Sequence, residues 1–230
     1  MDEDGPPHST RLRPPPEPEP YTWPLVALVL VILPQVLVPA SLREGPPLIV
    51  PIVEGAVALV LLGMAARPGP VPGGARPLIL VLVATLIAAN TAAALRLLVL
   101  VVRSTPAGET PPTVTQLLVG AGIVLSTNVV TFGLLYWQLD GGGPGGRRRQ
   151  ASAYPDFGFP QTLTEGLAPP AWQPRFPDYL YVAFTNIVAF SPTDTMPLTH
   201  RVKTLMALQS LIALSVLVLV LSRVINILPP

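Results

Sequence analysis

The sequence predicts an all-α membrane protein with about five transmembrane helices and a short re-entrant half-helix. Three observations lead to this fold class. Half of the 230 residues are apolar and only 12% are charged, which is typical of membrane proteins. Long apolar segments alternate with short polar joints. One further apolar segment, in the C-terminal quarter, is too short to cross a bilayer.

Residues 1–22 predict a disordered, partly polyproline-II tail, because they hold seven prolines, five acids and two arginines with almost nothing apolar. A cleaved signal peptide is the alternative for the start of the chain, since small residues at 38–40 follow an apolar run. Signal peptides begin with a basic region, whereas this tail is net acidic. An uncleaved helix is therefore favoured.

Four apolar segments follow the tail, and a fifth ends the chain. Each is long enough to span a bilayer. The joints between the first four are short, polar and rich in proline, which predicts antiparallel neighbours. The expected spans are 23–42, 48–66, 78–102, 114–139 and about 202–228.

Between the fourth and fifth spans, residues 140–178 predict a loop rich in glycine and arginine and then in aromatic residues and proline. Its glycine run lacks a Gly-Lys-Ser/Thr ending, so we interpret it as a linker and not as a phosphate loop. Of the fourteen aromatic residues of the chain, twelve lie between Phe132 and Phe190. We therefore expect the loop to fold onto the membrane interface, where aromatic rings are favoured; a disordered loop is the alternative.

Residues 179–230 predict a half-helix, a polar turn and the last span. The apolar run 179–190 supplies about 12 helical positions, or roughly 18 Å, against a hydrocarbon core of about 30 Å. It can dip into a bilayer but hardly cross it. Lipid cannot satisfy non-helical backbone, so a re-entrant segment needs a bundle or a pore around it.

The distribution of basic residues predicts the orientation of the chain. With five spans, ten lysines and arginines lie on the face of the N-terminus and the 140–178 loop, and four lie on the other. By the positive-inside rule the N-terminus is cytoplasmic and the protein is a multi-pass protein of the cell (inner) membrane.

Composition also excludes several functions. No cysteine is present, which removes disulfides, thiolate metal sites and cysteine nucleophiles. The two histidines, His8 and His200, cannot form a metal site alone, and there is no basic face for nucleic acid. Motifs such as His-Glu-x-x-His and Gly-x-Ser-x-Gly are absent from the sequence. We therefore expect neither an enzyme nor a cofactor; the lipid bilayer is the expected partner.

Polar residues inside the predicted spans need partners, because a charge at the centre of a helix costs about 2.5 to 3.5 kcal/mol on insertion scales. Glu54 and Arg96 lie at one depth on neighbouring antiparallel spans, so we expect an ion pair with Gln35 nearby. A transport or proton-relay role is the alternative. Asn90 and Asn128 are the other intramembrane polar candidates.

Small residues at helical spacing predict close helix packing. They form stripes on the third and fourth spans: Ala84, Ala88 and Ala92 on the third, and Gly122, Ser126 and Gly133 on the fourth.

The C-terminal 50 residues resemble the pore-helix, filter and inner-helix order of pore-loop potassium channels. The segment 194–199, Asp-Thr-Met-Pro-Leu-Thr, is similar to the Asp-x-x-Pro-x-Thr that follows the filter in that family. The resemblance implies homo-oligomers around a common axis and a monovalent cation as the permeant species. Residues near that axis would be Thr185, Asn186, Ser191, Thr193, Asp194 and Thr195.

Two departures limit this resemblance. Where the family has Gly-Tyr-Gly, this chain has Ser-Pro-Thr at 191–193, so potassium selectivity is not implied. The family's loop also enters from outside, whereas the basic residues place this one inside. The alternative is a simple turn, with Pro197 as the first residue of the last helix.

Two functions therefore stay open. One is an oligomeric cation-channel-like protein without the potassium filter sequence, and the other is a non-conducting membrane scaffold or partner-binding protein. The whole chain also looks like multi-pass membrane proteins of high-GC bacteria, a resemblance that implies no activity.

Overall fold

The computed structural model describes residues 19–37, 49–66, 75–102, 113–149, 154–169, 172–188 and 194–227. This part of the chain is mostly α-helical, which confirms the helical part of the predicted fold class. The larger helices are α1 (Thr22–Leu37), α2 (Ile49–Ala65), α3 (Ala75–Val102), α4 (Val114–Leu139), α7 (Phe176–Val188) and α8 (His200–Ile227). Shorter elements lie between α4 and α8: η2 (Asp140–Gly142), α5 (Gly143–Arg148), β1 (Phe157–Gly158), α6 (Pro160–Leu163) and β2 (Met196–Pro197).

Three stretches of helix are long and apolar enough to cross a membrane: Arg76–Val99, Val114–Arg148 and His200–Ile225. By the same measure α1 and α2 are shorter apolar helices. Their ranges nevertheless fall inside the apolar segments predicted at 23–42 and 48–66, apart from Thr22. The composition of the long helices suggests a membrane location for the protein.

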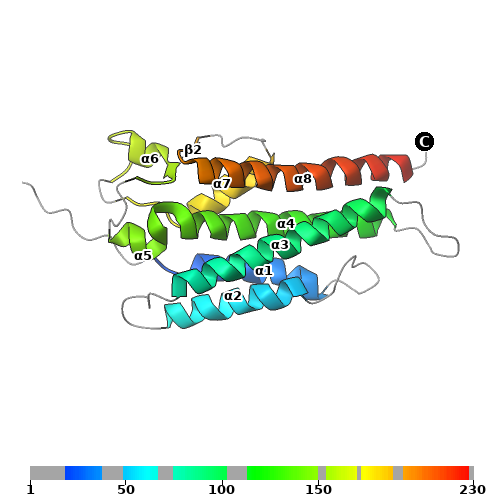
Figure 1. Cartoon of the computed structure of the whole chain (residues 1–230), viewed down its shortest axis with the longest axis horizontal. Coiled ribbons are helices and arrows are strands. Elements are labelled where there is room, and N and C mark those ends of the chain that lie inside the picture. The colour runs from blue at the N-terminus through cyan, green and yellow to red at the C-terminus, as the bar shows by residue number, and fades with distance from the viewer. Residues whose placement is uncertain are drawn as a thin grey trace, which may run out of the picture.

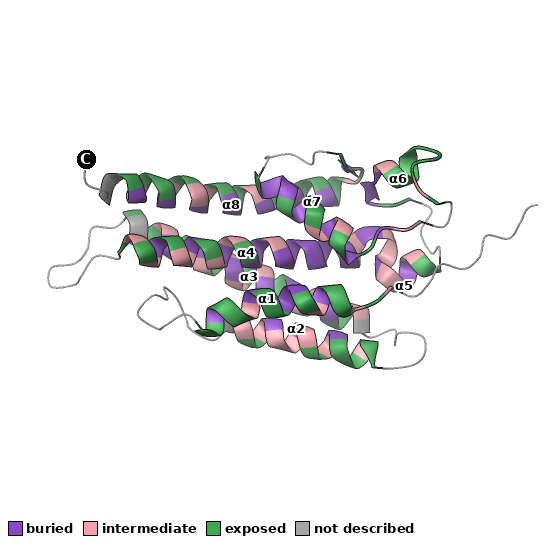
Figure 2. Cartoon of the chain, turned by 180° about the vertical axis from the view of Figure 1, so that it is seen from behind, coloured by how far each residue is buried: buried purple, intermediate pink, exposed green. Residues whose placement is uncertain are grey.

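The helices lie side by side, with α4 at the centre of the bundle (Figure 1). Helix α4 contacts α1, α3, α7 and α8, while α2 contacts α1 and α3. Residues 130–138 of α4 are all buried, whereas the other long helices show exposed faces along their length (Figure 2). Thr113 begins α4 with a capping box, accepting a hydrogen bond from the Gln116 backbone while Gln116 Oε1 accepts from Thr113 N at 2.7 Å.

Only part of the predicted small-residue packing forms within the chain. A Cβ at Gly133 would lie 3.2 Å from Leu180 Cα, so this glycine lets α7 approach the α4 backbone, as expected. The other small residues, by contrast, face outward. The exposed positions are Ala84, Ala88 and Ala92 on α3 and Gly122 and Ser126 on α4, so the prediction that they pack is wrong for contacts inside this chain.

Helix α7 begins at one end of the bundle, and the chain returns to that same end before α8. The Phe176 ring lies 5.8 Å from the ring of Trp137, near the end of α4. Strand β2 pairs antiparallel with β1, which matches Phe157 with Pro197. Helix α8 then begins at His200, at the same end (Figure 1). Pro197 thus lies in β2, and the alternative that made it the first residue of the last helix is wrong.

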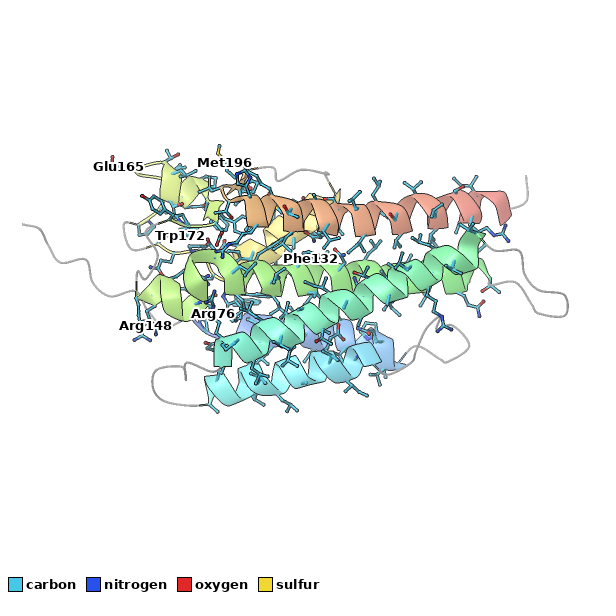
Figure 3. The ribbon with its side chains drawn as sticks, in the orientation of Figure 1. Arg76, Phe132, Arg148, Glu165, Trp172 and Met196 are labelled. Atoms are coloured by element: carbon cyan, nitrogen blue, oxygen red, sulfur yellow. The ribbon has the colours of Figure 1, made fainter. Side chains whose placement is uncertain are left out.

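The loop after α4 is folded where the structure describes it, which excludes the disordered alternative for those residues. Its rings pack on one another and on the end of the bundle, in contacts that include Tyr136, Phe157, Phe159, Trp172 and Tyr179. Figure 3 places Arg76, Arg148 and Trp172 toward this end and Phe132 nearer the middle of the molecule. Contact of the loop with a membrane interface stays a prediction.

Candidate functional site

Polar side chains gather in three places. The end cluster, at the end where α4 stops and α8 starts, comprises Glu19, Asp140, Arg147, Asp156, Tyr179, Thr199 and Arg201. The α7–α8 lock comprises Tyr136, Asn186 and Gln209. The mid-bundle cluster comprises Gln35, Glu54 and Thr127.

Asp140 is the central acceptor of the end cluster. Its carboxylate, on a residue only 2% exposed, accepts hydrogen bonds from Asp156 N at 2.6 Å, Phe157 N at 3.3 Å and Tyr179 Oη at 2.5 Å. Charge-assisted bonds of this kind are about twice as strong as neutral ones. Asp140 therefore fixes both the loop and α7 to the end of α4.

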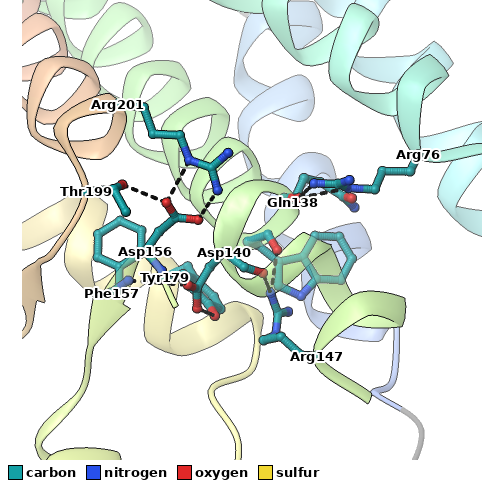
Figure 4. A network of polar contacts seen from close by, with 10 residues as sticks. Arg76, Gln138, Asp140, Arg147, Asp156, Phe157, Tyr179, Thr199 and Arg201 are labelled. Atoms are coloured by element: carbon teal, nitrogen blue, oxygen red, sulfur yellow. Dashed lines mark hydrogen bonds and ion pairs between the residues drawn. The ribbon is translucent and has the colours of Figure 1, made fainter. Parts of the chain in front are cut away.

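Asp156 fastens the loop to the start of α8 (Figure 4). Its buried carboxylate accepts from Thr199 Oγ1 at 2.6 Å and from Arg201 Nε at 2.7 Å, and it forms an ion pair with Arg201. Its carbonyl also accepts from Leu198 N at 2.8 Å. Side-chain and backbone contacts of Asp156 together thus hold the segment that leads into α8.

Arg147 fills the turn made by the glycine run. It donates to the carbonyl oxygens of Trp137 and Asp140, both at 2.8 Å, and its guanidinium lies 5.0 Å from the centre of the Tyr179 ring. Positive φ angles of 56° at Gly141 and 84° at Gly142 allow the reversal that aims it inward. The glycine run is therefore a fixed turn, and the interpretation of it as a linker is wrong for residues 141–146.

Glu19 brings the start of the chain into the end cluster. Its carboxylate pairs with Arg147 at 3.2 Å and accepts from Trp137 Nε1 and Phe176 N, both at 2.7 Å. Burial raises the pKa of Glu19 above its usual value, and the charge of Arg147 offsets this in part. The predicted tail is thus too long at its C-terminal end, because Glu19 is held by the fold; residues 1–18 lie outside the described residues.

The α7–α8 lock joins three helices through side-chain amides and a phenol. Asn186 Nδ2 donates to Gln209 Oε1 at 2.9 Å and to the Met206 carbonyl at 3.0 Å. Tyr136 Oη donates to the same Gln209 oxygen at 2.8 Å. Gln209 Nε2 completes the lock by donating to the Ala183 carbonyl at 2.9 Å. These bonds hold α7 in a single position against α4 and α8.

The structure does not gather into one group those pore-loop candidates that it describes. Asn186 belongs to the α7–α8 lock, and Thr185 Oγ1 donates to the Tyr181 carbonyl of its own helix at 2.9 Å. Thr195 is buried and donates to the exposed Asp194 at 3.3 Å. The other two candidates, Ser191 and Thr193, lie outside the described residues.

The mid-bundle cluster joins α1, α2 and α4. Gln35 Nε2 lies 2.7 Å from Glu54 Oε2, 2.9 Å from the Val31 carbonyl and 3.3 Å from Thr127 Oγ1. Gln35 is 6% exposed, Glu54 1% and Thr127 1%. The other oxygen of Glu54, Oε1, is buried without a hydrogen-bond partner among the residues that the structure describes. The expectation that Gln35 lies near Glu54 is confirmed.

The predicted ion pair between Glu54 and Arg96 is wrong. Arg96 is exposed on α3, and the ion pairs among the described residues do not include it. Its helix turns the stripe Ile79, Val83, Leu86, Asn90, Ala94 and Leu97 inward, and Arg96 lies off that stripe. The sequence placed both residues at similar depth but could not give the face of the helix.

The two asparagines of the predicted spans are both buried, Asn90 at 3% and Asn128 at 0% exposure. The amide nitrogen and oxygen of Asn128 make no hydrogen bond in the described part of the chain. Gln138 Nε2 is likewise buried and unpaired there, although the Gln138 carbonyl accepts from Arg76 Nε at 3.3 Å. Asn128 follows Thr127 directly and adds a second polar residue to the middle of α4.

Sequence reasoning missed the end cluster and Gln209. The available signal was modest: Asp140 directly follows an apolar span, and a buried carboxylate needs partners. Within the described ranges, no group of three or more histidine, cysteine, aspartate or glutamate side chains is arranged to hold a metal ion. Comparison with protein-family models, with curated proteins and with solved structures finds no match for this chain.

Proposed function

We propose that the protein is a multi-pass membrane protein in which α1, α2, α3, α4 and α8 span the bilayer and α7 is a re-entrant half-helix. Copies of it assemble around a common axis into a cation-channel-like particle without the potassium filter sequence. Its N-terminus and the 140–178 loop face the cytoplasm of a bacterial cell.

The path of the chain around α7 supports this proposal best. Helix α7 has 13 residues, or about 20 Å of length, which is short of the roughly 30 Å of a hydrocarbon core. Its start lies against Trp137, and β2 returns the chain to the same end, where Asp156 holds it. A short helix followed by a return to the same end supports the order of pore helix, turn and inner helix that the resemblance implies.

The α7–α8 lock favours a second candidate, a non-conducting membrane scaffold or partner-binding protein. The side chains of Thr185 and Asn186 donate hydrogen bonds to groups of α7 and α8, so a role in packing accounts for both residues without a permeant ion. A pore would then depend on Asp194, the exposed member of the pore-loop candidates that the structure describes.

Particle mass and cation flux distinguish the two candidates. The mass of the particle that the full chain forms in nanodiscs is measured first, because a single half-helix encloses a pore only in an oligomer. Vesicles containing the protein are then tested for potassium and sodium leak above empty vesicles. The channel-like proposal expects an oligomer and a leak that Asp194→Asn reduces, because a carboxylate concentrates cations at a pore mouth.

Glu165→Gln is the matched control for Asp194→Asn, since both remove one exposed carboxylate and Glu165 lies in the loop. The control should leave the leak unchanged. A monomeric mass together with no leak from well-folded protein would end the channel-like proposal and leave the scaffold.

The orientation has its own test, which the absence of native cysteines makes simple. Single cysteines at Ser9, Ser152 and Pro230 are treated with an impermeant thiol reagent on intact cells. We expect labelling only at Pro230. Labelling at Ser9 or Ser152 without labelling at Pro230 would reverse the orientation.

A further inference from the structure

The mid-bundle cluster contains a buried carboxyl group that the pore-loop proposal does not use. Glu54 is 1% exposed in the apolar helix α2. One of its oxygens accepts from Gln35 Nε2 at 2.7 Å, and the other has no hydrogen-bond partner in the described part of the chain. Whether Glu54 is neutral or ionised therefore decides how much free energy its burial costs.

Among the described residues of the helices packed around Glu54, no cation offsets a charge on its carboxyl group. Helix α1 contains no titratable side chain, and Glu54 is the only one on α2. On α3, Arg96 is exposed and Arg76 donates to the Gln138 carbonyl. On α4, the titratable Tyr136 is bonded to Gln209. Glu54 thus faces amide, hydroxyl and apolar groups.

Under these conditions the neutral carboxyl is the less costly form. Burying an ionised carboxylate without a counter-charge costs far more than burying a neutral polar group, and such a group takes up a proton instead. Gln35 donates to Oε2, which leaves Oε1 as the oxygen that carries the proton. Gln35, itself bonded to the Val31 carbonyl and next to Thr127 Oγ1, holds the carboxyl in place.

We propose that Glu54 is a proton-binding site inside the bundle, protonated at Oε1 near neutral pH, with Gln35 as its positioning residue. The ligand of the site is a proton, and the reversible step is formation and cleavage of the Oε1–H bond. The inference rests on the membrane topology of the proposed function, since it places α2 in the bilayer. It does not rest on the pore loop, so loss of the channel-like proposal would leave it intact.

Infrared spectroscopy of the full chain in nanodiscs tests the site directly. The wild-type protein near pH 7 should show the C=O stretch of a protonated carboxyl, at a pH where exposed carboxyl groups, with pKa values of about 4, are ionised. The Glu54→Gln variant should lack this band, and Glu165→Gln should keep it. A wild-type spectrum without the band would overturn the proposal, and this readout needs no reagent to reach the site.

Gln35→Leu tests the positioning role. If Gln35 holds the carboxyl, this variant keeps the band but shifts its frequency, because the hydrogen bond to Oε2 is lost. An unchanged band would overturn the role assigned to Gln35.

A hydrophobic carbodiimide gives a second measurement, because it adds to protonated carboxyl groups in membranes. Peptide mapping should find the adduct on Glu54 near pH 7, and less of it as the pH rises. Sodium or potassium chloride at constant pH should not protect Glu54. Protection by either salt would overturn the assignment and make the group part of a metal-cation site.

Discussion

Asp140 and Asp156 at the end of the bundle and Glu54 in its middle are buried to the same degree, at 2%, 1% and 1% exposure. Their surroundings differ. Each aspartate oxygen lies near donors from the loop, α7 or α8, whereas Glu54 has, among the described residues, one donor and one unpaired oxygen. Acids at the end of the bundle hold chain segments together through several hydrogen bonds each, while the acid in the middle joins α1 and α2 through a single one.

The largest expected effect is on the end cluster. Asp140→Ala removes the acceptor of two backbone N–H groups and the Tyr179 hydroxyl, and each unpaired buried group costs about 1 to 3 kcal/mol. We expect the free energy of unfolding in mixed micelles to fall by about 3 kcal/mol or more. Asp194→Asn, at an exposed position, should change it by less than about 0.5 kcal/mol. If Asp140→Ala and Asp194→Asn had the same free energy of unfolding, the end cluster would not stabilise the fold.

The α7–α8 lock should give a smaller and separable effect. Asn186→Ala and Gln209→Ala each remove partners of the other, so their effects on the free energy of unfolding should not add. A double-mutant cycle is expected to give a coupling of about 1 kcal/mol. Thr185→Ala serves as the control, because its hydroxyl bonds within α7. A cycle in which the Asn186 and Gln209 losses simply add would contradict the lock.

Arg96 offers the sharpest contrast with the end cluster. Since Arg96 is exposed and forms no ion pair with Glu54, Arg96→Leu should not lower the free energy of unfolding, because it removes a charge from a helix proposed to span the bilayer. Gln35→Leu, which removes the donor to Glu54, should cost about 1 to 2 kcal/mol. When Arg96→Leu and Glu54→Gln are combined, their changes in the free energy of unfolding should add. A coupling between them would mean that Glu54 pairs with Arg96, contrary to the structure, in which Glu54 bonds to Gln35.

The smallest expected effect is the pH dependence due to Glu19. Its pKa in the folded state is raised above 4.5, mainly by burial, so the folded state binds this proton more tightly than the unfolded state. The contribution of Glu19 to stability is therefore greatest below about pH 4.5 and falls as the pH rises through the raised value. The difference in unfolding midpoint between wild type and Glu19→Gln should change in that direction. If the stabilisation by Glu19 instead grew as the pH rises, the pairing of ionised Glu19 with Arg147 would outweigh the effect of its burial.

The sequence predicted well what depends on local composition. Helix α4 begins and ends where its apolar run does, at 114 and 139, and α7 is confirmed as a short helix. The buried face of each helix was harder to predict, because α2 and α3 are apolar on most of their surface and their sequences show no clear inward stripe. That is why Glu54 and Arg96 were placed at one depth but wrongly joined.

The end cluster could not be predicted because its contacts join distant segments. Thr199 lies 43 residues from Asp156, and Arg147 lies 128 residues from Glu19. A glycine run such as 141–146 has the same composition in a linker and in a fixed turn. The inward position of the Arg147 side chain, which the composition does not give, distinguishes the fixed turn from a linker.

The contacts of Glu19 have a consequence for the order in which the protein is made. Its donors Trp137 and Phe176 come 118 and 157 residues later in the chain. At about 5 to 20 residues per second, a ribosome needs on the order of 10 s to reach them. During that time the start of α1 is held by none of these groups. The Glu19 contacts ahead of α1 therefore form only after the loop and the start of α7 have been synthesised.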